Sequence, residues 1–570
     1  MCGIAGVVFG VCQEEKILQA LHAIEYRGSV WGGLSGPEHA FYAVRLPRSG
    51  NRERAQPVVS PKGNVLVLNG EIYNAAELSL SIGVEPAADL IDTELLAAWL
   101  DDKGIDGLSR LNGEYSLAWY EVSRSTLHLA RDPLGTHPMY YCESNGRVAF
   151  GSSAKSAVLL AGRDVRVDAE AANDFLWFGV SVDGSAVRGA HRVEPAEVVT
   201  FRRDRTTLRR RTEVPQLRSE DLLGSLRSAV EQRVSSSSRA FLAFSGGIDS
   251  SLVASVWPLD RCARYRLTAE ERSCDRDLTL VRAGAESLAG ALETLAPWVE
   301  RPLTSLTGPA FYLLCRQAAT DGHEVRLGGE GADEIFLGYP HYFGPAARNH
   351  PFLRTKDELR SVVMDLLGMS PSERGTTLMR RHLAGRNRDD WNAFDREVRL
   401  PEHLNTVNND IPSLLAGLES RCPYLALSGY KYPTSQAVAK ADLAALSLQQ
   451  GLPAPLKEPV FFGCSILPSR AIHALAQESE ARNVLPTPAP SSGRVAEVLE
   501  KCASVGCAAD PIRETLCAYV VGRWSLGRAF GASPARECLP DRFTELSFLE
   551  GRRLLASDTA LYAPASRVRA

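Results

Sequence analysis

The hydrophobic pattern changes character near the middle of the chain. Residues 1 to about 205 hold short apolar runs that end at turns, for example at 65–70, 116–120 and 127–130. Apolar and polar positions that alternate over four to eight residues are typical of strands with one buried face. The runs at 116–120 and 127–130 flank a short loop and predict a hairpin. We therefore expect the first part of the chain to be built mainly from short strands.

From about residue 216 the apolar positions recur with helical spacing, beginning at 221–230. A five-residue apolar strand follows at 240–244, and after it come a glycine-rich turn and a helix from Ser250. Similar strand, loop and helix units repeat later in the chain. Such repetition predicts an α/β domain whose sheet is mainly parallel. The pattern assigns no role to residues 340–400 or to the last hundred residues.

Length and composition narrow the class of protein. A chain of 570 residues is too long for one compact core, so two or more domains are expected. A hydrophobic fraction of 45% and a charged fraction of 23% are ordinary for a globular protein, and the net charge of -4 argues against a nucleic-acid binder. No apolar run is long enough for a membrane helix, and no basic segment precedes an apolar stretch at the start. We therefore expect a cytoplasmic protein that binds neither nucleic acid nor membranes.

The cysteines support the same location. The twelve cysteines include no CxxC pair, and 570 residues are too many for a disulfide scaffold. Cys502 and Cys507 have no histidine near them, so a zinc site is not expected. We interpret most of the cysteines as buried thiols in a reducing compartment.

One cysteine carries a chemical signal of its own. Cys2 directly follows Met1, and a Met that precedes a small residue is normally removed. The mature chain would then begin with a cysteine whose α-amine, with a pKa near ~8, can take the proton of its own thiol. Cys2 is therefore a candidate nucleophile.

A second signal lies between the predicted strand at 240–244 and the helix that follows it. The loop 245–251 reads Ser-Gly-Gly-Ile-Asp-Ser-Ser, so glycines let backbone amides approach an anion at a helix N-terminus. Asp249 would repel phosphate unless a metal lay between them, which implies Mg²⁺. Because no lysine follows the glycines, the loop is not the common P-loop. A second segment, 327–339, places three acids among glycines at a predicted strand end, where open parallel sheets bind ligands.

The loop 245–251 resembles that of the ATP-pyrophosphatase family, in which it holds the pyrophosphate that leaves when ATP adenylates a carboxylate. Together with Cys2 and the acidic segment 327–339, it resembles glutamine-dependent asparagine synthetases with an N-terminal cysteine. The resemblance runs from residue 2 to about 465. It implies an αββα N-terminal-nucleophile glutaminase domain followed by an α/β parallel-sheet ATP-pyrophosphatase domain. The domains are expected at 2–205 for the glutaminase and 216–530 for the ATP-binding domain, with a C-terminal tail of unknown role at 531–570.

In the glutaminase half, the resemblance makes Cys2 the nucleophile and Arg45 the clamp for the α-carboxylate of glutamine. The segment 69–74, Asn-Gly-Glu-Ile-Tyr-Asn, matches a turn of the family. There the Asn69 side chain and the Gly70 amide would form the oxyanion hole, whose loss often costs ~10²–10³ in rate. The α-amine of glutamine would be held by Asp92 and Glu71.

In the synthetase half, the resemblance makes Asp249 and Asp333 ligands of Mg²⁺ and places the acid Glu330 at the reacting centre. Lys457, in a Leu-Lys-Glu-Pro segment, would neutralise charge on the α- and β-phosphates. The residues expected to contact ATP are Leu242, Ala243, Phe244, Ser245, Gly246, Gly247, Asp249, Ser250 and Gly329.

Several positions depart from the family's pattern. Leu306 stands where asparagine synthetases carry an arginine associated with aspartate, and Arg301 is a candidate to compensate. Ala426 replaces the last acid of the family's Leu-Glu-x-Arg-x-Pro-Phe-Leu-Asp segment. Ser29-Val30 replace a Pro-Asp pair near the glutaminase site. Leucine cannot satisfy the charged groups of aspartate, so the acceptor is open.

The resemblance implies a glutamine-hydrolysing, ATP-dependent amide synthetase with aspartate to asparagine as the default reaction. An acceptor from specialised metabolism or on a peptide is an alternative. A ring-closing relative, of the β-lactam synthetase or lasso-peptide cyclase type, is disfavoured because those usually lack the glutaminase residues. A non-enzymatic scaffold is disfavoured because both sets of site residues are intact. The expected ligands are glutamine, ATP, Mg²⁺ and a carboxylate acceptor. A homodimer is one candidate assembly, and the sequence leaves the oligomeric state open.

Overall fold

The computed structural model describes most of the chain. The described residues are 1–46, 56–85, 91–181, 184–212, 221–234, 239–258, 262–268, 278–343, 370–382, 388–431, 438–452, 464–482, 484–485, 491–504 and 511–530. Lys457 and the predicted tail at 531–570 lie outside them. The described chain forms two compact units, the first from Met1–Val165 with Gly189–Leu217 and the second from Arg166–Arg188 with Arg218–Ser533.

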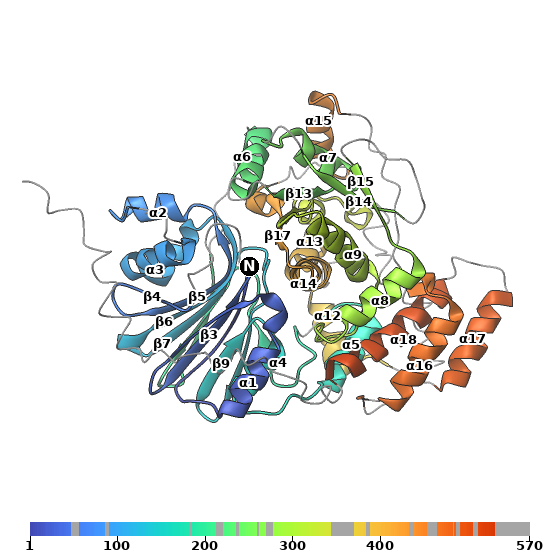
Figure 1. Cartoon of the computed structure of the whole chain (residues 1–570), viewed down its shortest axis with the longest axis horizontal. Helices are drawn as coiled ribbons and strands as arrows, with labels where there is room; N and C mark the ends of the chain where they lie inside the picture. Colours follow the sequence, from blue (N-terminus) through green and yellow to red (C-terminus); the bar gives the residue numbers. More distant parts are fainter. Residues whose placement is uncertain are drawn as a thin grey trace, which may run out of the picture. The chain divides into compact units, whose positions relative to one another are not determined.

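The first unit is a sandwich of two six-stranded antiparallel sheets (Figure 1). One sheet has the order β10 (His191–Arg192), β8 (Tyr140–Ser144), β9 (Arg147–Gly151), β1 (Cys2–Val8), β3 (His39–Arg45), β2 (Val30–Ser35). The other has the order β12 (Thr207–Arg211), β11 (Glu197–Arg202), β7 (Thr126–Arg131), β6 (Gly113–Glu121), β5 (Val65–Ile72), β4 (Val58–Val59). The predicted hairpin is confirmed as β6 and β7, which pair in antiparallel register.

The alternating pattern of β5 explains how this unit buries two cores. Val65 and Val67 face the opposite sheet and belong to the core between the sheets. Leu66 and Leu68 point the other way, into a second core shared with Trp99 of α3. Helices therefore cover both outer faces (Figure 1): α1 (Glu14–His22) and α4 (Ala154–Leu160) on one side, α2 (Ala75–Ser81) and α3 (Asp92–Lys103) on the other. The αββα architecture expected for the N-terminal part is confirmed.

The second unit contains a five-stranded parallel sheet, which confirms the predicted α/β class. Its order is β15 (Leu278–Arg282), β14 (Arg264–Thr268), β13 (Ala240–Ala243), β16 (Val325–Leu327), β17 (Glu419–Arg421). The chain builds outward from β13 to β15 on one side and then returns to add β16 and β17 on the other. The gap between β13 and β16 is therefore a topological switch point, where open parallel sheets bind ligands at the carboxyl ends of the strands.

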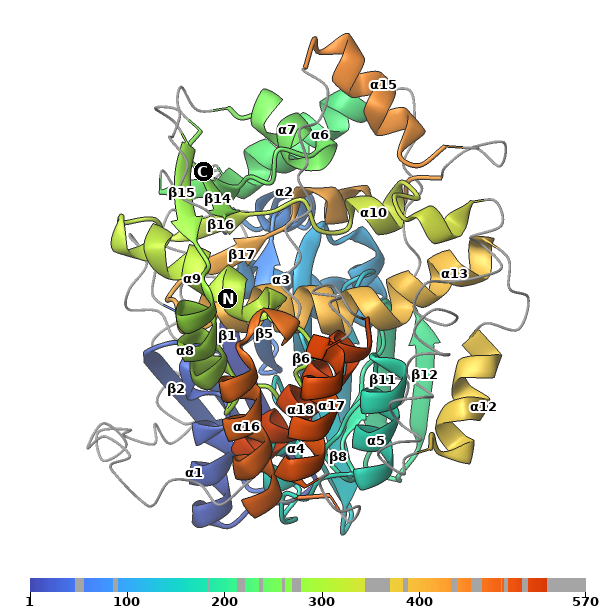
Figure 2. The same ribbon diagram turned by 90° about the vertical axis from the view of Figure 1, so that its right-hand side faces the viewer.

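Helices lie on both faces of this sheet (Figures 1 and 2). The helices nearest to it are α6 (Leu222–Val234), α7 (Ile248–Ser255), α8 (Ala285–Leu295), α9 (Thr307–Thr320), α10 (Ala332–Ile335) and α14 (Ile411–Leu415). The other α-helices among the described residues of this unit are α5 (Ala169–Phe178), α12 (Glu373–His382), α13 (Arg388–Phe394), α15 (Ala441–Gln449), α16 (Ser469–Ala481), α17 (Ser492–Ser504) and α18 (Pro511–Phe530). A π-helix, η7 (Asp395–Asp410), joins α13 to α14, and a 3-10 segment, η8 (Pro423–Leu427), follows β17.

The structure also bears on the expectations about membrane helices and disulfides. In the described part of the chain, no helix is long and apolar enough to cross a membrane. The eight cysteines that the structure describes form no disulfide, as their reading as thiols requires.

Candidate active sites

The first candidate site lies where β1, β3 and β5 meet. Cys2 begins β1, is buried, and stands opposite Arg45 in the register of β1 and β3. Across the sandwich, the backbone nitrogen of Cys2 donates a hydrogen bond of 3.1 Å to Oδ1 of Asn69 on β5. The structure thus brings together a thiol, a cationic side chain and an amide side chain that the sequence spreads over nearly seventy residues.

Asn69 and Gly70 have properties that suit an oxyanion hole. Asn69 is fully buried, and its Nδ2 has no hydrogen-bond partner among the residues that the structure describes. A buried donor in that state costs about 1–3 kcal/mol, which a ligand oxygen would recover. Gly70 has a φ of 139°, and a Cβ there would lie 1.9 Å from the carbonyl oxygen of Glu114. Only glycine fits this position between β5 and β6.

The remaining predicted glutamine contacts lie at the end of β5. Glu71 directly follows Gly70 in that strand. Asp92 begins α3, and its carboxylate accepts hydrogen bonds from the backbone nitrogens of Ile72 at 2.9 Å and Thr93 at 2.8 Å. These bonds fix the Asp92 carboxylate beside the strand that carries Asn69.

Two features of this site were not predicted. Gln56 lies beside the thiol, with its Nε2 3.6 Å from Sγ of Cys2, and both polar atoms of its amide bond the backbone of Leu68. No motif surrounds Gln56, so sequence reasoning had no signal for it. At the departure from the family's Pro-Asp pair, the nitrogen of Ser29 donates to the carbonyl of Arg45 at 3.0 Å. A proline could not make that bond, so serine adds support to the strand that holds Arg45.

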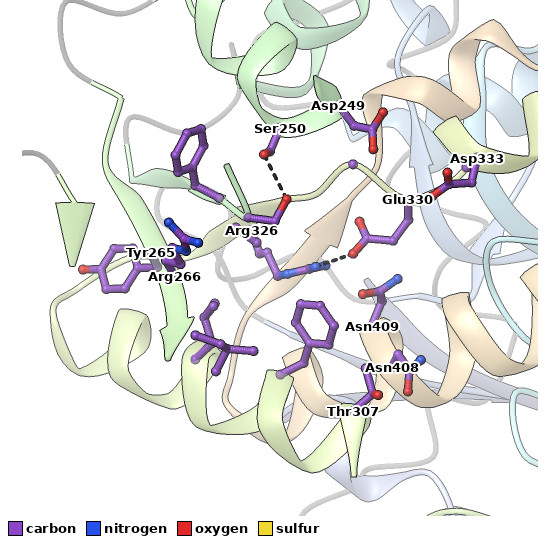
Figure 3. A pocket seen from close by; sticks show the side chains of 18 of the residues that line it. Asp249, Ser250, Tyr265, Arg266, Thr307, Arg326, Glu330, Asp333, Asn408 and Asn409 are labelled. Carbon is purple, nitrogen blue, oxygen red and sulfur yellow. Dashed lines mark hydrogen bonds and ion pairs between the residues drawn. The ribbon is translucent and has the colours of Figure 1, made fainter. Parts of the chain in front are cut away.

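The second candidate site is a cavity of about 370 Å³ at the switch point between β13 and β16 (Figure 3). It is lined from five directions: the loop after β13, the end of β14, one face of α9, the loop between β16 and α10, and the end of η7. The predicted site residues that line it are Ala243, Phe244, Ser245, Asp249, Ser250, Gly329, Glu330 and Asp333. The predicted ATP contacts Leu242, Gly246 and Gly247 lie in the same strand and loop but do not line the cavity.

The loop after β13 is held in shape by its own serines. Oγ of Ser245 accepts a hydrogen bond from the nitrogen of Gly247 and lies 3.2 Å from Oγ of Ser250. Gly246 has a φ of 78°, which favours glycine. The loop thereby turns sharply from β13 into α7 and presents Ser245 and Ser250 at the cavity.

A lysine joins the two predicted magnesium ligands. Nζ of Lys440 lies 2.6 Å from Oδ2 of Asp249 and 2.7 Å from Oδ1 of Asp333. Burial opposes the charge of the Lys440 ammonium, but the two carboxylates outweigh burial and hold the pKa of Lys440 above its usual value. Lys440 has a φ of 51°, which is uncommon for a residue other than glycine. No motif surrounds Lys440 in the sequence, and its place in the site was not predicted.

The two carboxylates fit a magnesium ion. They converge on one point occupied by a cationic nitrogen, and Mg²⁺ at phosphate sites is usually bound by one or two carboxylates together with phosphate oxygens. Among the described residues, no group of three or more acidic, histidine or cysteine side chains could hold a metal by itself. Asp249 and Asp333 would therefore need further oxygens, from phosphate or water, to complete the coordination.

Glu330 is tied to a buried arginine that sequence reasoning missed. Nη2 of Arg326 donates to Oε1 of Glu330 at 2.5 Å, and Nη1 donates to Oγ of Ser420 at 2.9 Å. Its guanidinium also lies 4.9 Å from the centre of the Phe311 ring. Burial disfavours the positive charge of Arg326, but the attraction of the Glu330 carboxylate outweighs the effect of burial, so the pKa of Arg326 is raised. The sequence did hold a signal for Arg326, because it lies between Val325 and Leu327 in a short strand. An arginine buried in such a strand needs a charged or polar partner.

A second acid in the cavity has an unusual titration. Glu334 on α10 is buried, and its Oε1 accepts a hydrogen bond of 2.7 Å from the hydroxyl of Tyr339. Burial raises the pKa of the Glu334 carboxyl to about 7, with a further contribution from the neighbouring Asp333. Both Glu334 and Tyr339 line the cavity.

The positions that depart from the family's pattern do not supply a cation to the cavity. Leu306 is fully buried ahead of α9 and does not line it. Arg301 forms a buried ion pair of 2.6 Å with Glu402 and does not line it either. The proposed compensation by Arg301 therefore has no support in this geometry. Ala426 lies in η8, the 3-10 segment that follows β17.

Comparison with known proteins agrees with this two-site arrangement. Residues 1–212 match the family model described as glutamine amidotransferase domain, and residues 264–428 match asparagine synthase. The chain is 27% identical over 419 residues to asparagine synthetase [glutamine-hydrolyzing] 1 of Bacillus subtilis, covering 67% of this chain and 66% of that protein. It is 25% identical over 381 residues to asparagine synthetase B of Escherichia coli, covering 60% of this chain and 65% of that one. These two matches span slightly less than two thirds of each relative.

Among solved structures, glutamine phosphoribosylpyrophosphate amidotransferase from B. subtilis matches 63% of this chain and 88% of its own, with 13% identity and a TM-score of 0.29. A score that low carries no argument about function. The two family models follow one another along the chain in the same order as the two candidate sites. The chain therefore carries a glutamine amidotransferase domain followed by an asparagine synthase domain, and over much of its length it is similar to glutamine-hydrolysing asparagine synthetases.

Proposed function

We propose that this protein is a glutamine-hydrolysing, ATP-dependent amide synthetase, a carbon–nitrogen ligase that takes its nitrogen from glutamine. The observation that carries the proposal is the presence of two separate sites of complementary chemistry. One holds a buried thiol beside an unsatisfied amide donor, and the other is a cavity with carboxylates beside a phosphate-type loop. The substrates are small molecules, and we place the reaction in the cytoplasm, where glutamine and ATP are plentiful.

In the first site, removal of Met1 would leave Cys2 with an α-amine that takes the proton of its own thiol. The thiolate attacks the side-chain amide of glutamine to form a tetrahedral intermediate. The nitrogen takes a proton from the α-ammonium group and leaves as ammonia, and a glutamyl thioester remains on Cys2. Water then releases glutamate. Nδ2 of Asn69 and the backbone nitrogen of Gly70 would stabilise the oxyanion, while Arg45 would hold the α-carboxylate of glutamine and Asp92, with Glu71, its α-amine.

In the second site, an acceptor carboxylate attacks the α-phosphate of ATP and pyrophosphate leaves. Ammonia then attacks the acyl-adenylate, and AMP leaves as the amide forms. Glu330 would take the proton that the attacking ammonia must lose. Mg²⁺ would be held by Asp249 and Asp333 and would neutralise charge on the phosphates. Lys457, outside the described residues, keeps the phosphate-neutralising role that the family resemblance implies.

Aspartate is the first acceptor to test, because the relatives are named asparagine synthetases. Leu306 and the buried ion pair of Arg301 keep an acceptor from specialised metabolism or on a peptide as the alternative. A ring-closing reaction is the less favoured alternative. Such a reaction uses an internal amine, and the first site would then serve no purpose.

The two-site proposal can be tested with one substitution. Cys2→Ala should abolish amide synthesis from glutamine but retain synthesis from ammonium salts, because only the nitrogen supply is removed. Cys12→Ala is the matched control, since this thiol lies in the same unit and donates a hydrogen bond to the carbonyl of Leu159 in α4. Pyrophosphate release and amide product are measured with a panel of carboxylic acids that includes aspartate. Equal loss of the glutamine and ammonia reactions in Cys2→Ala would contradict the proposal.

A further inference from the structure

The cavity of the second site has two ends with different chemistry (Figure 3). At one end lie the serines of the loop after β13, together with Tyr265 and Arg266 from β14. At the other end lie Thr307 and Phe311 from α9 and Asn408 and Asn409 from η7. The Arg326–Glu330 pair stands between the two. ATP is proposed to bind at the phosphate loop, so the α9 and η7 end is where the acceptor would bind.

The charged side chains next to the acceptor end, Arg326 and Glu330, already form an ion pair with each other. Arg326 is bonded to Glu330 at 2.5 Å and stacked on Phe311. The other side chains that α9 and η7 contribute to the cavity are neutral: Thr307, Leu314 and the two asparagines. A free amino acid would bring an ammonium group here, and a buried charge without a partner is costly. The acceptor end therefore favours a molecule that is neutral apart from its reacting carboxylate.

The side-chain amide of Asn409 is a candidate to form hydrogen bonds with the acceptor. It is only 4% exposed and lines the cavity, and both Oδ1 and Nδ2 lack a hydrogen-bond partner among the described residues. Figure 3 shows its side chain projecting from η7 into the cavity, on the same side as Glu330. One buried acceptor and one buried donor, side by side, match a group that presents a donor and an acceptor together. An N-acylated residue in the extended conformation does so, because the N–H of its amide and its own C=O turn to the same side.

The helix that carries Asn409 is itself unusual. It is a π-helix with Pro401 inside it, and π-helical turns are rare and often occur at functional sites. It packs closely on α9, because a Cβ at Gly308 would lie 2.9 Å from the carbonyl oxygen of Val407. This contact holds the two asparagines beside the start of α9, next to Thr307.

From these observations we propose that the acceptor is an N-acylated amino acid or short peptide, and that Asn409 is the residue that recognises its amide. The inference rests on the proposed function and names the substrate class of its second site. The carboxylate would lie near Glu330, the amide would pair with Asn409, and the rings and chains of Phe311 and Leu314 would contact apolar parts of the acceptor.

The substrate class can be tested with matched pairs. The full-length protein is given glutamine, Mg-ATP and each of the common amino acids, once free and once as its N-acetyl derivative, and pyrophosphate and amide product are measured. We expect the N-acetyl member to react at least about tenfold faster in every pair that reacts, because it alone satisfies Asn409 without adding an ammonium group. Faster reaction of the free acids, aspartate included, would overturn the inference and leave the proposed function standing. No pyrophosphate from any acid, with glutamine still hydrolysed, would overturn the proposed function and the inference with it.

The role of Asn409 is tested by Asn409→Leu, which keeps the number and branching of heavy atoms but removes both polar atoms. The kcat/KM for the N-acetyl acceptor should fall about 10- to 100-fold, mainly through KM, and the preference within each pair should disappear. Asn405→Leu is the matched control, because Asn405 lies one turn earlier on η7, has the same unpartnered amide and does not line the cavity. It should retain the preference. Thermal unfolding verifies that both variants fold, and an Asn409→Leu protein that keeps the preference would overturn the assignment.

Discussion

At the scale of single residues, Asn69 links the two sheets of the first unit. Its Oδ1 accepts from the nitrogen of Cys2, which leaves Nδ2 as the buried donor for a ligand. The β5 register places Gly70 next, where no side chain fits. The nucleophile and the proposed oxyanion hole are therefore aligned by one side chain, and a change at Asn69 should affect both.

We predict that Asn69→Leu lowers glutamine hydrolysis by ~10²–10³, the usual effect of removing one oxyanion donor. Initial rates of glutamate release measure this. Amide synthesis from ammonium salts in the same preparation is the internal control and should be retained, because the second unit is unchanged. Glutamate release at the wild-type rate would exclude Asn69 from the oxyanion hole.

Lys440 is the residue whose effect on the second site is easiest to isolate. Lys440→Met leaves Asp249 and Asp333 without the cation between them, which should destabilise the fold by on the order of 3 kcal/mol. The two carboxylates should then bind Mg²⁺ without nucleotide, with water molecules in place of the phosphate oxygens. Added Mg²⁺ alone should raise the midpoint of thermal unfolding of Lys440→Met by roughly 3 °C, and should not raise that of the wild type.

The Lys440 prediction has a direct control. Adding Asp333→Asn to Lys440→Met removes one of the two carboxylates and should abolish the stabilisation by Mg²⁺. A Mg²⁺ effect of the same size in the double variant would show that the ion binds elsewhere.

Glu334 gives a pH dependence with a definite sign. Its folded-state pKa of about 7 lies above the ordinary 4.5, so the native state holds this proton more tightly than the unfolded chain. The resulting stability is fully present below the unfolded pKa and is lost as pH rises through about 7. Glu334→Gln removes the effect, so relative to wild type it should gain up to about 3 kcal/mol in unfolding free energy between pH 4.5 and 8. Denaturant unfolding at both pH values measures the gain.

Glu293→Gln is the control for that experiment, because it removes the same charge from an exposed position of α8. Its unfolding free energy should follow that of the wild type at every pH. If Glu334→Gln also runs parallel to the wild type, burial does not perturb Glu334.

At the scale of elements, the strand, loop and helix unit at β13 was predictable because its pattern is local. A short apolar run, two glycines and a helical run each require only neighbouring residues. η7 could not be predicted, since its wide turns around Pro401 depend on packing against α9 and not on its own periodicity. The same limit applies to Arg326, Lys440 and Gln56, whose roles arise from contacts between distant segments.

The contact between α9 and η7 makes a prediction for the acceptor. Gly308→Ala would place a methyl group 2.9 Å from a backbone oxygen, so the two helices must move apart. We expect the KM for the acceptor to rise by roughly tenfold, while the rate of glutamine hydrolysis is retained. Steady-state kinetics of both half-reactions separate these effects.

Gly290→Ala is the matched control for Gly308→Ala. Gly290 lies inside α8, and a Cβ there would meet nothing within 4 Å. This variant should keep the acceptor KM and gain about 0.5–1 kcal/mol in stability from the better helix former. An unchanged KM in Gly308→Ala would show that the spacing of the two helices does not shape the acceptor site.

At the scale of the whole molecule, the units do not follow the chain in simple order. Arg166–Arg188, ahead of the last strands of the first unit, belong to the second. Within it, Leu176 of α5 packs with Leu485, Tyr519 and Leu526, and Asp174 accepts hydrogen bonds from Ser372. The amphipathic pattern of α5 predicts a buried face but not which core receives it, so its membership in the second unit was not visible in the sequence.

This arrangement predicts the behaviour of a fragment. A protein made of residues 1–212, the part that matches the amidotransferase family model, would expose the apolar face of α5 that the second unit covers. We expect it to self-associate, as measured by light scattering after gel filtration, because exposed apolar patches promote association. Leu176→Lys should make the fragment more monomeric, whereas Glu170→Lys, at an exposed position of α5, should not.

In the full-length chain the effect of the lysine at position 176 should reverse. Leu176→Lys buries a charge and lowers the midpoint of thermal unfolding, and Glu170→Lys leaves that midpoint nearly unchanged. A monomeric wild-type fragment, together with an unaffected full-length Leu176→Lys protein, would show that α5 is not held by the second unit in solution.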